Sequence, residues 1–525
     1  MNLKPFTHFF SNTLFYCVIF LFTMQLHGCG SIPDNSKMSI AMAIENKGDT
    51  VLDKIVERER LEHPDKSGVI MLSDGLDAFV ARASLAIAAE KSLDIQYYLF
   101  HDDTIGGLMV DQILKAADRG VKVRILLDDF DLGGKDKNLL ILNSHANIQV
   151  RLFNPFNRDF SRTGQLATRL GDVTRRMHNK MFIADNSMVI LGGRNIGDEY
   201  FDIDPSRAFS DLDVLLTGKV VSEASKGFDL YWNSEVVYPI DLLANDDFNE
   251  QDLAKGREVL FSLTKEQSTS AYAQALMSSD LAIKIKADNL SFTWLDASIY
   301  YDHPIKVRRA RDEREYQLIT ALEPYFKTLN QELFIITPYF VPGEEGTLFL
   351  TDLAKQGINV TILTNSLASN DVLAVHSGYS RYRKQLLKAG VSLHEMKPKI
   401  NVITGKGSSN KSAFGSSKTS LHTKSFVLDK KYIFIGSLNL DPRSTYENTE
   451  VGTILTSPDI GEGMISIIRK SLQSSTFEVQ LNNDDIIWVE KRQDEVVIHN
   501  KEPYTSWWQR LSVKLLQCLP IESQL

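Results

Sequence analysis

The sequence predicts an α/β protein made of two pseudo-symmetric halves, and two observations carry this prediction. Helical and strand-like apolar periods alternate in both halves, and one five-residue pattern occurs twice. The length of 525 residues supports the division, because it exceeds what one hydrophobic core usually organises. The two copies, with counterparts 244 residues apart, are His178, Lys180, Asp185, Gly192 and Asn195, and His422, Lys424, Asp429, Gly436 and Asn439.

Composition and the repeat together divide the chain into five predicted segments. The segments are 1–28, an export signal of lipoprotein type; 29–67, a polar tether with a short helix at 53–62; 68–250, the first domain; 251–480, the second domain; and 481–525, a C-terminal extension with an amphipathic helix.

The N-terminal 28 residues have the composition of an export signal. Lys4 supplies a positive charge, and the apolar run at 14–24 is too short for a comfortable membrane span. Leu26-His-Gly-Cys29 resembles a bacterial lipobox, which predicts cleavage before Cys29 and lipid attachment to its thiol. The predicted location is the bacterial cell envelope, membrane-anchored and facing the periplasm. Because His27 is not the small residue usual there, an uncleaved inner-membrane anchor stays open as the alternative.

Both halves alternate helices and strands in the same order. In the first half, apolar residues recur at helical spacing over 76–91 and 105–119, and strand-like runs occupy 93–100 and 121–127. In the second half, the predicted helices lie around 315–329 and 347–356, and the predicted strands at 333–337 and 358–364.

Each copy of the pattern lies on a predicted strand pair. Asp185 and Asp429 stand where the first strand of each pair ends, which favours a role in the turn over a catalytic role. Residues 401–420, rich in Ser, Gly and Lys, predict a mobile loop before the second copy. The strands are predicted at 180–184 and 189–191, and at 424–428 and 432–435.

Overall composition narrows the function. A hydrophobic fraction of 43% and a charged fraction of 24% are ordinary for globular proteins and exclude a many-span membrane protein. The formal net charge of −9 lacks the basicity common in nucleic-acid binders, so no nucleic-acid partner is expected.

The C-terminal extension contains an amphipathic segment. One helical face is expected to carry most of its apolar residues, with Arg510 and Lys514 elsewhere, as in a helix that lies in a membrane interface. These apolar residues are Trp507, Trp508, Leu511, Leu515, Leu516 and Leu519. A helix that closes the core explains the same spacing equally well.

The repeated His-x-Lys pairs suit phosphodiester chemistry without a metal or cofactor. Side chains two positions apart on a strand point the same way, so each copy aims an imidazole and an ammonium into one cleft. One imidazole attacks phosphorus, the other protonates the departing oxygen, and the lysines neutralise the anion. The acidic pairs at 102–103, 128–129 and 202/204 are interpreted as caps or solvated faces, and no metal is expected.

At these residues the chain resembles the phospholipase D superfamily, whose signature is a paired H-x-K motif. Further stretches resemble bacterial cardiolipin synthases, closest to the type C branch. They are Leu93-Asp-Ile-Gln-Tyr-Tyr98, Arg151-Leu-Phe-Asn-Pro-Phe156, Gly192-Gly-Arg-Asn-Ile-Gly-Asp198, Thr337-Pro-Tyr-Phe-Val-Pro342, Thr364-Asn-Ser-Leu-Ala368, Val375-His-Ser-Gly-Tyr-Ser-Arg-Tyr-Arg383 and Asn439-Leu-Asp-Pro-Arg443.

The resemblance implies two phospholipase D-like α/β/α domains, each with a central mixed sheet, that share one active site at their interface. It implies transfer of a phosphatidyl group from one phospholipid, in the type C branch phosphatidylethanolamine, to phosphatidylglycerol through a phosphohistidine. A membrane surface and a possible protein helper are the other implied partners. Three alternatives stay open: a phospholipase D that hydrolyses phospholipids, a secreted nuclease of the same superfamily, and a catalytically inactive envelope scaffold that binds phospholipid or a partner protein.

The resemblance also assigns roles to residues. His178 is the expected nucleophile and His422 the general acid and then base, although the two roles are interchangeable. Lys180, Lys424, Asn195 and Asn439 are expected to hold the phosphate oxygens. Glu450 is expected to orient His178, and Asp211 or Asp213 to orient His422.

Overall fold

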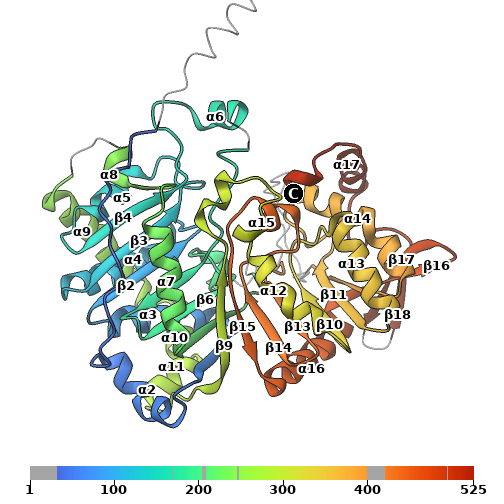
Figure 1. Cartoon of the computed structure of the whole chain (residues 1–525), viewed down its shortest axis with the longest axis horizontal. Coiled ribbons are helices and arrows are strands. Elements are labelled where there is room, and N and C mark those ends of the chain that lie inside the picture. Colours follow the sequence, from blue (N-terminus) through green and yellow to red (C-terminus); the bar gives the residue numbers. More distant parts are fainter. Residues whose placement is uncertain (1–31, 170, 204–208, 245–247, 399–419, 493–494) are drawn as a thin grey trace, which may run out of the picture.

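Two α/β halves lie side by side in the computed structural model, with strands β9 and β15 between them (Figure 1). The structure describes residues 32–169, 171–203, 209–244, 248–398, 420–492 and 495–525. The predicted export signal, Cys29 and nearly all of the loop predicted at 401–420 lie outside the described residues.

The first half is built on a mixed sheet with the strand order β8-β4-β3-β2-β5-β6-β7-β1. Strands β2, β3 and β4 are parallel, and the remaining neighbours are antiparallel. The strands are β1 (Ser67–Leu72), β2 (Ser92–Tyr97), β3 (Lys122–Asp128), β4 (Ile148–Phe153), β5 (Met181–Ala184), β6 (Met188–Gly192), β7 (Asp213–Gly218) and β8 (Val237–Pro239).

The second half repeats this arrangement with the order β9-β15-β14-β13-β10-β11-β12-β16-β17-β18. Strands β10, β11 and β12 are parallel, like β2 to β4, and β9 also pairs with β1, which joins the two sheets. The strands are β9 (Thr293–Tyr301), β10 (Glu332–Ile336), β11 (Asn359–Asn365), β12 (Ser392–Met396), β13 (Ser425–Leu428), β14 (Tyr432–Gly436), β15 (Val451–Thr456), β16 (Thr476–Asn482), β17 (Asp485–Arg492) and β18 (Glu495–His499).

Helices cover the faces of both sheets, which confirms the predicted α/β class of two pseudo-symmetric halves. The helices are α2 (Val51–Glu62), α3 (Gly75–Ala88), α4 (Thr104–Asp118), α5 (Asp136–Asn143), α6 (Arg162–Thr168), α7 (Val221–Trp232), α8 (Ile240–Leu243), α9 (Glu250–Gln267), α10 (Ala271–Met277), α11 (Asp280–Lys286), α12 (Leu318–Lys327), α13 (Gly343–Lys355), α14 (Leu373–Lys388), α15 (Pro442–Tyr446), α16 (Pro458–Ser475) and α17 (Trp507–Gln517).

One apolar core is shared by the two halves. It combines side chains of β5, β6, β7 and α7 with side chains of β10, β13, β14, β15 and α16. Two further cores lie on the outer sides, one under α3 and α4 and one under α12, α13 and α14. Because burial of apolar area is the main favourable term in folding, the shared core fixes the position of one half against the other.

The His-x-Lys pairs stand directly before strands β5 and β13, which begin one residue later than predicted. Strand β5 begins at Met181 and β13 at Ser425, so His178 and His422 belong to extended segments that precede them. The reason is a change of partner. Here the backbone pairs with the opposite half and not with a neighbouring strand of its own sheet.

Asp185 and Asp429 lie in the turns at the far ends of β5 and β13, away from the histidines. Both residues have positive φ, 52° and 49°. The Asp185 carboxylate accepts the backbone N–H groups of residues 90–92, and Asp429 accepts those of residues 330–332. These contacts tie each turn to the start of the neighbouring strand, and they support the structural role that the sequence favours for both aspartates over a catalytic one.

The C-terminal extension is fixed to α14 by a buried charge cluster. Glu502 Oε1 accepts a hydrogen bond from Arg383 at 2.6 Å and lies 3.1 Å from His376 Nε2. Burial alone would raise the pKa of Glu502, but the charges of Arg383 and His376 outweigh it and lower the pKa to about 2. The motif at 375–383 therefore has a structural use, because it holds the extension in place.

We expect Asp185→Ala and Asp429→Ala each to lower the free energy of unfolding by about 2 to 3 kcal/mol, because backbone donors lose a charged acceptor. Denaturant unfolding measures this loss. Asp485→Ala, at an exposed position, is the control and leaves stability unchanged. Full stability combined with lost turnover would contradict the structural role.

The stability contributed by Glu502 depends on pH. Because its pKa in the folded state lies below the ordinary 4.5, ionised Glu502 stabilises the fold above about pH 4.5, and this contribution is lost as the pH falls toward 2. We expect Glu502→Gln to cost on the order of 3 kcal/mol near pH 7, with the difference from wild type disappearing in acid. Unfolding measured across this pH range tests it, with exposed Glu495→Gln as control; a difference that does not vary with pH would contradict it.

Candidate active site

The two motif histidines lie where the halves meet, and the backbone of each is bonded to the opposite half. The His178 N–H donates to the Thr449 carbonyl at 2.8 Å, and the His422 N–H donates to the Ser210 carbonyl at 2.8 Å. The charge of His422 also lowers the pKa of His178, so the two imidazoles belong to one electrostatic cluster. The repeat predicts this meeting of the two copies.

Each imidazole contacts a carboxylate from the other half. His178 Nδ1 lies 2.9 Å from Glu450 Oε2, and His422 Nδ1 lies 2.5 Å from Asp211 Oδ2. A carboxylate that accepts from Nδ1–H keeps the proton on that nitrogen and leaves Nε2 as the reactive atom. This is the exchange of acids that the family resemblance implies.

Asp213, the alternative partner of His422, is used elsewhere. It is the first residue of β7, and its carboxylate binds Arg82 at 2.8 Å in the interior of the first half. Arg194 lies beside the same carboxylate and donates to backbone carbonyls. Asp213 and Arg194 therefore form a structural ion-pair cluster, and the histidine-orienting placement of Asp213 is corrected.

Lys180 and Lys424 are each only 1% exposed. Lys180 Nζ donates to the His178 carbonyl at 2.6 Å, and Lys424 Nζ lies 2.8 Å from His422 Nδ1. Burial lowers the pKa of Lys180 well below its ordinary value and that of Lys424 to about 8. Two buried ammonium groups are costly unless an anion accompanies them, so the cluster suits a bound phosphate.

The two histidines differ in how readily they hold a proton. Burial and the charges of the two lysines hold the pKa of His178 well below 6.5. Burial and Lys424 also lower the pKa of His422, but the charge of Asp211 opposes this effect. The two carboxylates that contact these histidines also differ in pKa. Burial raises the pKa of Glu450 to about 7. At Asp211 the charges of His422 and Lys424 outweigh burial and lower the pKa.

The two motif asparagines flank this cluster. Asn195 Nδ2 donates to the Tyr200 hydroxyl at 2.8 Å, and Asn195 Oδ1 accepts the Leu99 N–H. Asn439 Nδ2 reaches Ser444 Oγ at 3.4 Å. In the structure both amides therefore contact their own half, and each Nδ2 carries a second N–H that these bonds do not use.

Aromatic rings line the histidines. The Tyr98 ring meets His178 edge-on at 5.0 Å between centroids, and Lys180 Nζ lies 5.4 Å from the centre of the same ring. On the other side, Tyr200 and Phe209 lie 5.4 and 5.2 Å from the His422 ring. These apolar walls explain the burial that lowers the pKa of both imidazoles.

The family described as "Cardiolipin synthase, PLD-like domain" matches the chain twice, over residues 84–232 and 325–472. Each match contains one complete copy of the motif and the acid that contacts the opposite histidine. The chain belongs to the cardiolipin synthase family. It is accordingly an enzyme of the phosphatidyltransferase class with two phospholipase D-like domains.

Curated relatives of this cardiolipin synthase family member match along most of its length. "Cardiolipin synthase C" of Escherichia coli (strain K12) is 38% identical over 88% of this chain and 97% of that protein. An uncharacterised protein of Helicobacter pylori (strain ATCC 700392 / 26695) is 32% identical over 96% of this chain and 98% of its own length.

A solved structure shows the same fold. The phosphatidylserine synthase of Haemophilus influenzae Rd KW20 superposes with a TM-score of 0.56 at 13% identity, covering 90% of this chain and all of that chain. The match extends over both halves, which supports the two-domain architecture.

Sequence reasoning missed a buried ion pair behind Glu450 of this synthase. Asp302 Oδ2 accepts the Glu450 backbone N–H at 2.7 Å, and Asp302 Oδ1 lies 3.0 Å from Lys306 Nζ. The charge of Lys306 acts against the rise in the pKa of Glu450. No local pattern marks the pair, because Asp302 and Lys306 lie far from Glu450 in the sequence.

The acidic pair at 128–129 differs from its sequence interpretation as a cap or a solvated face. Both carboxylates are buried, Asp128 against Arg176 at 2.9 Å and Asp129 against Arg158 and Arg162.

Among the described residues, the imidazole and carboxylates of His101, Asp103 and Glu199 lie close enough together to share a cation.

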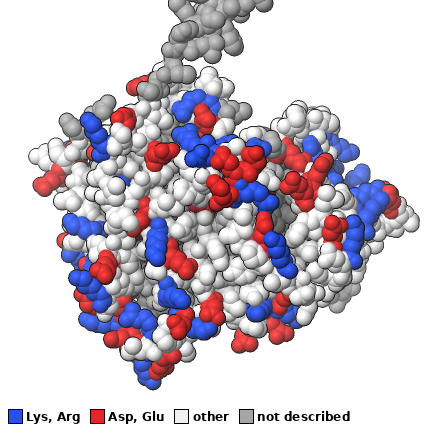
Figure 2. Space-filling view, in the orientation of Figure 1, with Lys and Arg blue, Asp and Glu red and all other residues white. Residues whose placement is uncertain are grey.

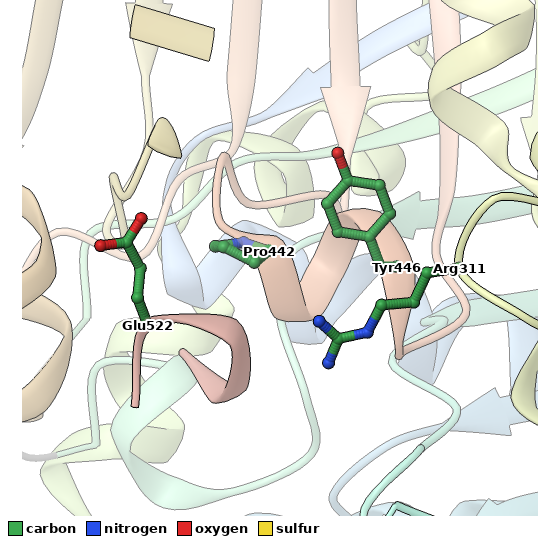
Figure 3. A pocket seen from close by; sticks show the side chains of 4 residues that line it. All are labelled: Arg311, Pro442, Tyr446 and Glu522. Atoms are coloured by element: carbon green, nitrogen blue, oxygen red, sulfur yellow. The ribbon is translucent and has the colours of Figure 1, made fainter. Parts of the chain in front are cut away.

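A surface pocket of about 350 Å³ lies beside α15, the helix that follows the second motif. Arg311, Pro442, Tyr446 and Glu522 line it (Figure 3). The motif histidines do not line this pocket. Because Glu522 lies near the C-terminus and Pro442 and Tyr446 belong to α15, the pocket lies where the C-terminal residues approach this helix.

We expect Glu450→Gln to lower kcat by about 10² to 10⁴, because the amide no longer keeps the proton on Nδ1 of His178. Steady-state turnover of phospholipid measures the loss. The matched control is Glu490→Gln, which removes a buried carboxylate 2.9 Å from His499 in the C-terminal extension. Equal losses in both variants would indicate a stability effect only.

Proposed function

We propose that this cardiolipin synthase family member moves a phosphatidyl group from one phospholipid to phosphatidylglycerol through a phosphohistidine. One observation carries the proposal: two imidazoles from opposite halves share a buried, lysine-rich cluster, and each contacts its own carboxylate. A covalent intermediate needs a nucleophile and a separate acid, and this arrangement supplies both.

His178 is the nucleophile in this proposal. Its pKa lies well below 6.5, so the imidazole is neutral near pH 7, and the Glu450 contact on Nδ1 leaves the Nε2 lone pair available. Nε2 attacks phosphorus while the bond from phosphorus to the departing headgroup oxygen breaks. His422 acts in its protonated form and donates its proton to that oxygen; burial and Lys424 lower its pKa, and the contact with Asp211 opposes that effect.

The second step regenerates the enzyme. A hydroxyl of phosphatidylglycerol gives its proton to the now neutral His422, and its oxygen attacks phosphorus as the bond to His178 breaks. The product is cardiolipin, and both histidines return to their starting states. Lys180 and Lys424 stabilise the charge on the non-bridging oxygens in both steps.

The donor in this proposal is phosphatidylethanolamine, as the type C resemblance implies, with a protein helper as a further partner. The relative called "Cardiolipin synthase C" supports the likeness to the type C branch from which this choice is taken. Water in place of the acceptor gives phospholipase D hydrolysis by the same steps. Superfamily nuclease activity is the weaker candidate, because the net charge is −9 and both signs are interspersed on the face seen in Figure 2.

The proposed location is the cell envelope, with a lipid on Cys29 and the body facing the periplasm; an uncleaved inner-membrane anchor is the alternative. Within the described part of the chain, no helix has the length and apolar character to cross a bilayer. The lipobox-like ending before Cys29 supports the lipidated form.

We expect His178→Asn to abolish transfer and to leave no acid-labile phosphoenzyme when the protein is incubated with labelled phosphatidylethanolamine and phosphatidylglycerol. His422→Asn lacks the acid but keeps the nucleophile. It is therefore expected to accumulate phosphoenzyme from a donor whose leaving group needs no protonation. Mass spectrometry of the lipids and of the trapped protein measures both results.

His499→Asn, in the C-terminal extension, is the control and keeps full turnover. If the His178→Asn variant instead carried the labelled phosphatidyl group on His422, then His422 would be the nucleophile and His178 the acid. Turnover at the wild-type rate without either histidine would overturn the mechanism.

A further inference from the structure

The C-terminal helix α17 turns its apolar side to solvent. We define the α17 face as Trp507, Trp508, Leu511 and Leu515, which are 57%, 61%, 36% and 62% exposed. Positions 507, 511 and 515 are spaced four residues apart, and Trp508 lies next to this row, so the four side chains share one side. Val513 is the residue of α17 that is buried against the protein. The sequence left a core-closing helix open, and this exposure contradicts it.

The charges within α17 itself are positive. Arg510 and Lys514 lie in the helix, and α17 contains no acidic residue. Figure 2 shows mostly white atoms over α17, with both basic and acidic side chains on the neighbouring surface. Aromatic and aliphatic side chains flanked by cations match the boundary of a bilayer that contains anionic lipid.

The helix is held firmly in this orientation. Its capping box joins Ser506 and Gln509, and the Gln517 side chain donates to Ser380 Oγ in α14 at 2.7 Å. Arg381 of α14 binds Glu522 just beyond the helix. The exposed face is therefore a fixed feature of the folded protein.

The chain after α17 returns to the active-site end of the molecule. The carbonyl of Leu525 accepts the Arg443 N–H at 2.7 Å, and Arg443 in turn donates to the Thr174 carbonyl, four residues before His178. Figure 1 shows α17 at the same end of the molecule as α15 and α6. A surface on which α17 rests is thus next to the end that receives substrate.

The described chain also begins at this end. Asn35 donates to the carbonyls of Glu235 and Val237, beside β8, which pairs with the end of β4. Asn154, which follows β4, donates to the Arg175 carbonyl close to His178. The first described residues therefore lie on the side of the body where the active site lies.

We propose that the α17 face docks the protein on a phospholipid bilayer and so presents the active-site end to its substrates. This proposal rests on the proposed function. Another exposed apolar pair, Val259 and Phe261 on α9, is 70% and 68% exposed, but α9 carries four acidic residues. An anionic surface disfavours α9 and favours α17.

The first test uses the full chain and vesicles of brominated phosphatidylglycerol, which quench nearby tryptophan fluorescence. We expect quenching of the wild type and its loss in Trp507→Phe/Trp508→Phe, with Trp294→Phe as the matched control that keeps it. Quenching that is the same in all three proteins would overturn the proposal.

The second test measures function on two physical forms of substrate. Trp507→Ser/Trp508→Ser is expected to lower turnover on phosphatidylglycerol-containing vesicles by at least about tenfold, because two large apolar surfaces no longer enter the lipid. Turnover of dispersed short-chain lipids stays unchanged, and Val259→Ser/Phe261→Ser leaves both rates unchanged.

The third test removes the positive charges of α17, and an inactive variant separates docking from catalysis. Arg510→Gln and Lys514→Gln are each expected to weaken vesicle binding about fivefold at low salt and less at high salt. His178→Asn abolishes turnover but keeps the quenching, which separates a failure of the proposed function from a failure of docking. Two results together would overturn the membrane role in favour of a protein partner. The wild-type tryptophans would show no quenching by the vesicles, and Trp507→Ser/Trp508→Ser would change the oligomeric state.

Discussion

The structure depends on one constraint: each motif histidine takes its carboxylate and its backbone partner from the opposite half. His178 contacts Glu450 and the Thr449 carbonyl, and His422 contacts Asp211 and the Ser210 carbonyl. Neither half therefore contains a complete acid–imidazole pair. The shared apolar core and strand β9, which pairs with both β1 and β15, keep the two halves in the required position.

Pseudo-symmetry brings two like imidazoles together, and the surrounding residues make them different. Burial raises the pKa of Glu450, which accepts a hydrogen bond from Ser437, even though the charges of Lys180 and Lys306 act against this rise. At Asp211 the charges of His422 and Lys424 outweigh burial and lower the pKa. Two chemically equal groups with different environments can take the two roles of nucleophile and acid. The ion pair of Asp302 and Lys306, placed behind Glu450, belongs to the side of the site that contacts His178.

Burial connects the chemistry to the substrate. Lys180 and Lys424 are costly to keep charged inside the protein, and an incoming phosphate lowers that cost. The C-terminal extension adds the spatial context, since Glu502 anchors it to α14 and Leu525 ends beside α15. The proposed headgroup chemistry and the proposed contact with a lipid surface therefore lie at the same end of the molecule.

The sequence by itself determined the α/β class, the two-fold repeat, the turn role of Asp185 and Asp429, and the motif residues of the site, because these follow from local periodicity and fixed spacing. It located the strands of both motifs to within one residue, but not the pairing of His178 and His422 with the backbone of the opposite half. Only the tertiary structure decided between Asp211 and Asp213, revealed Asp302 and Lys306, and turned α17 outward. Those features depend on contacts between residues far apart in the chain, and burial and pairing across the two halves have no local signature in a sequence.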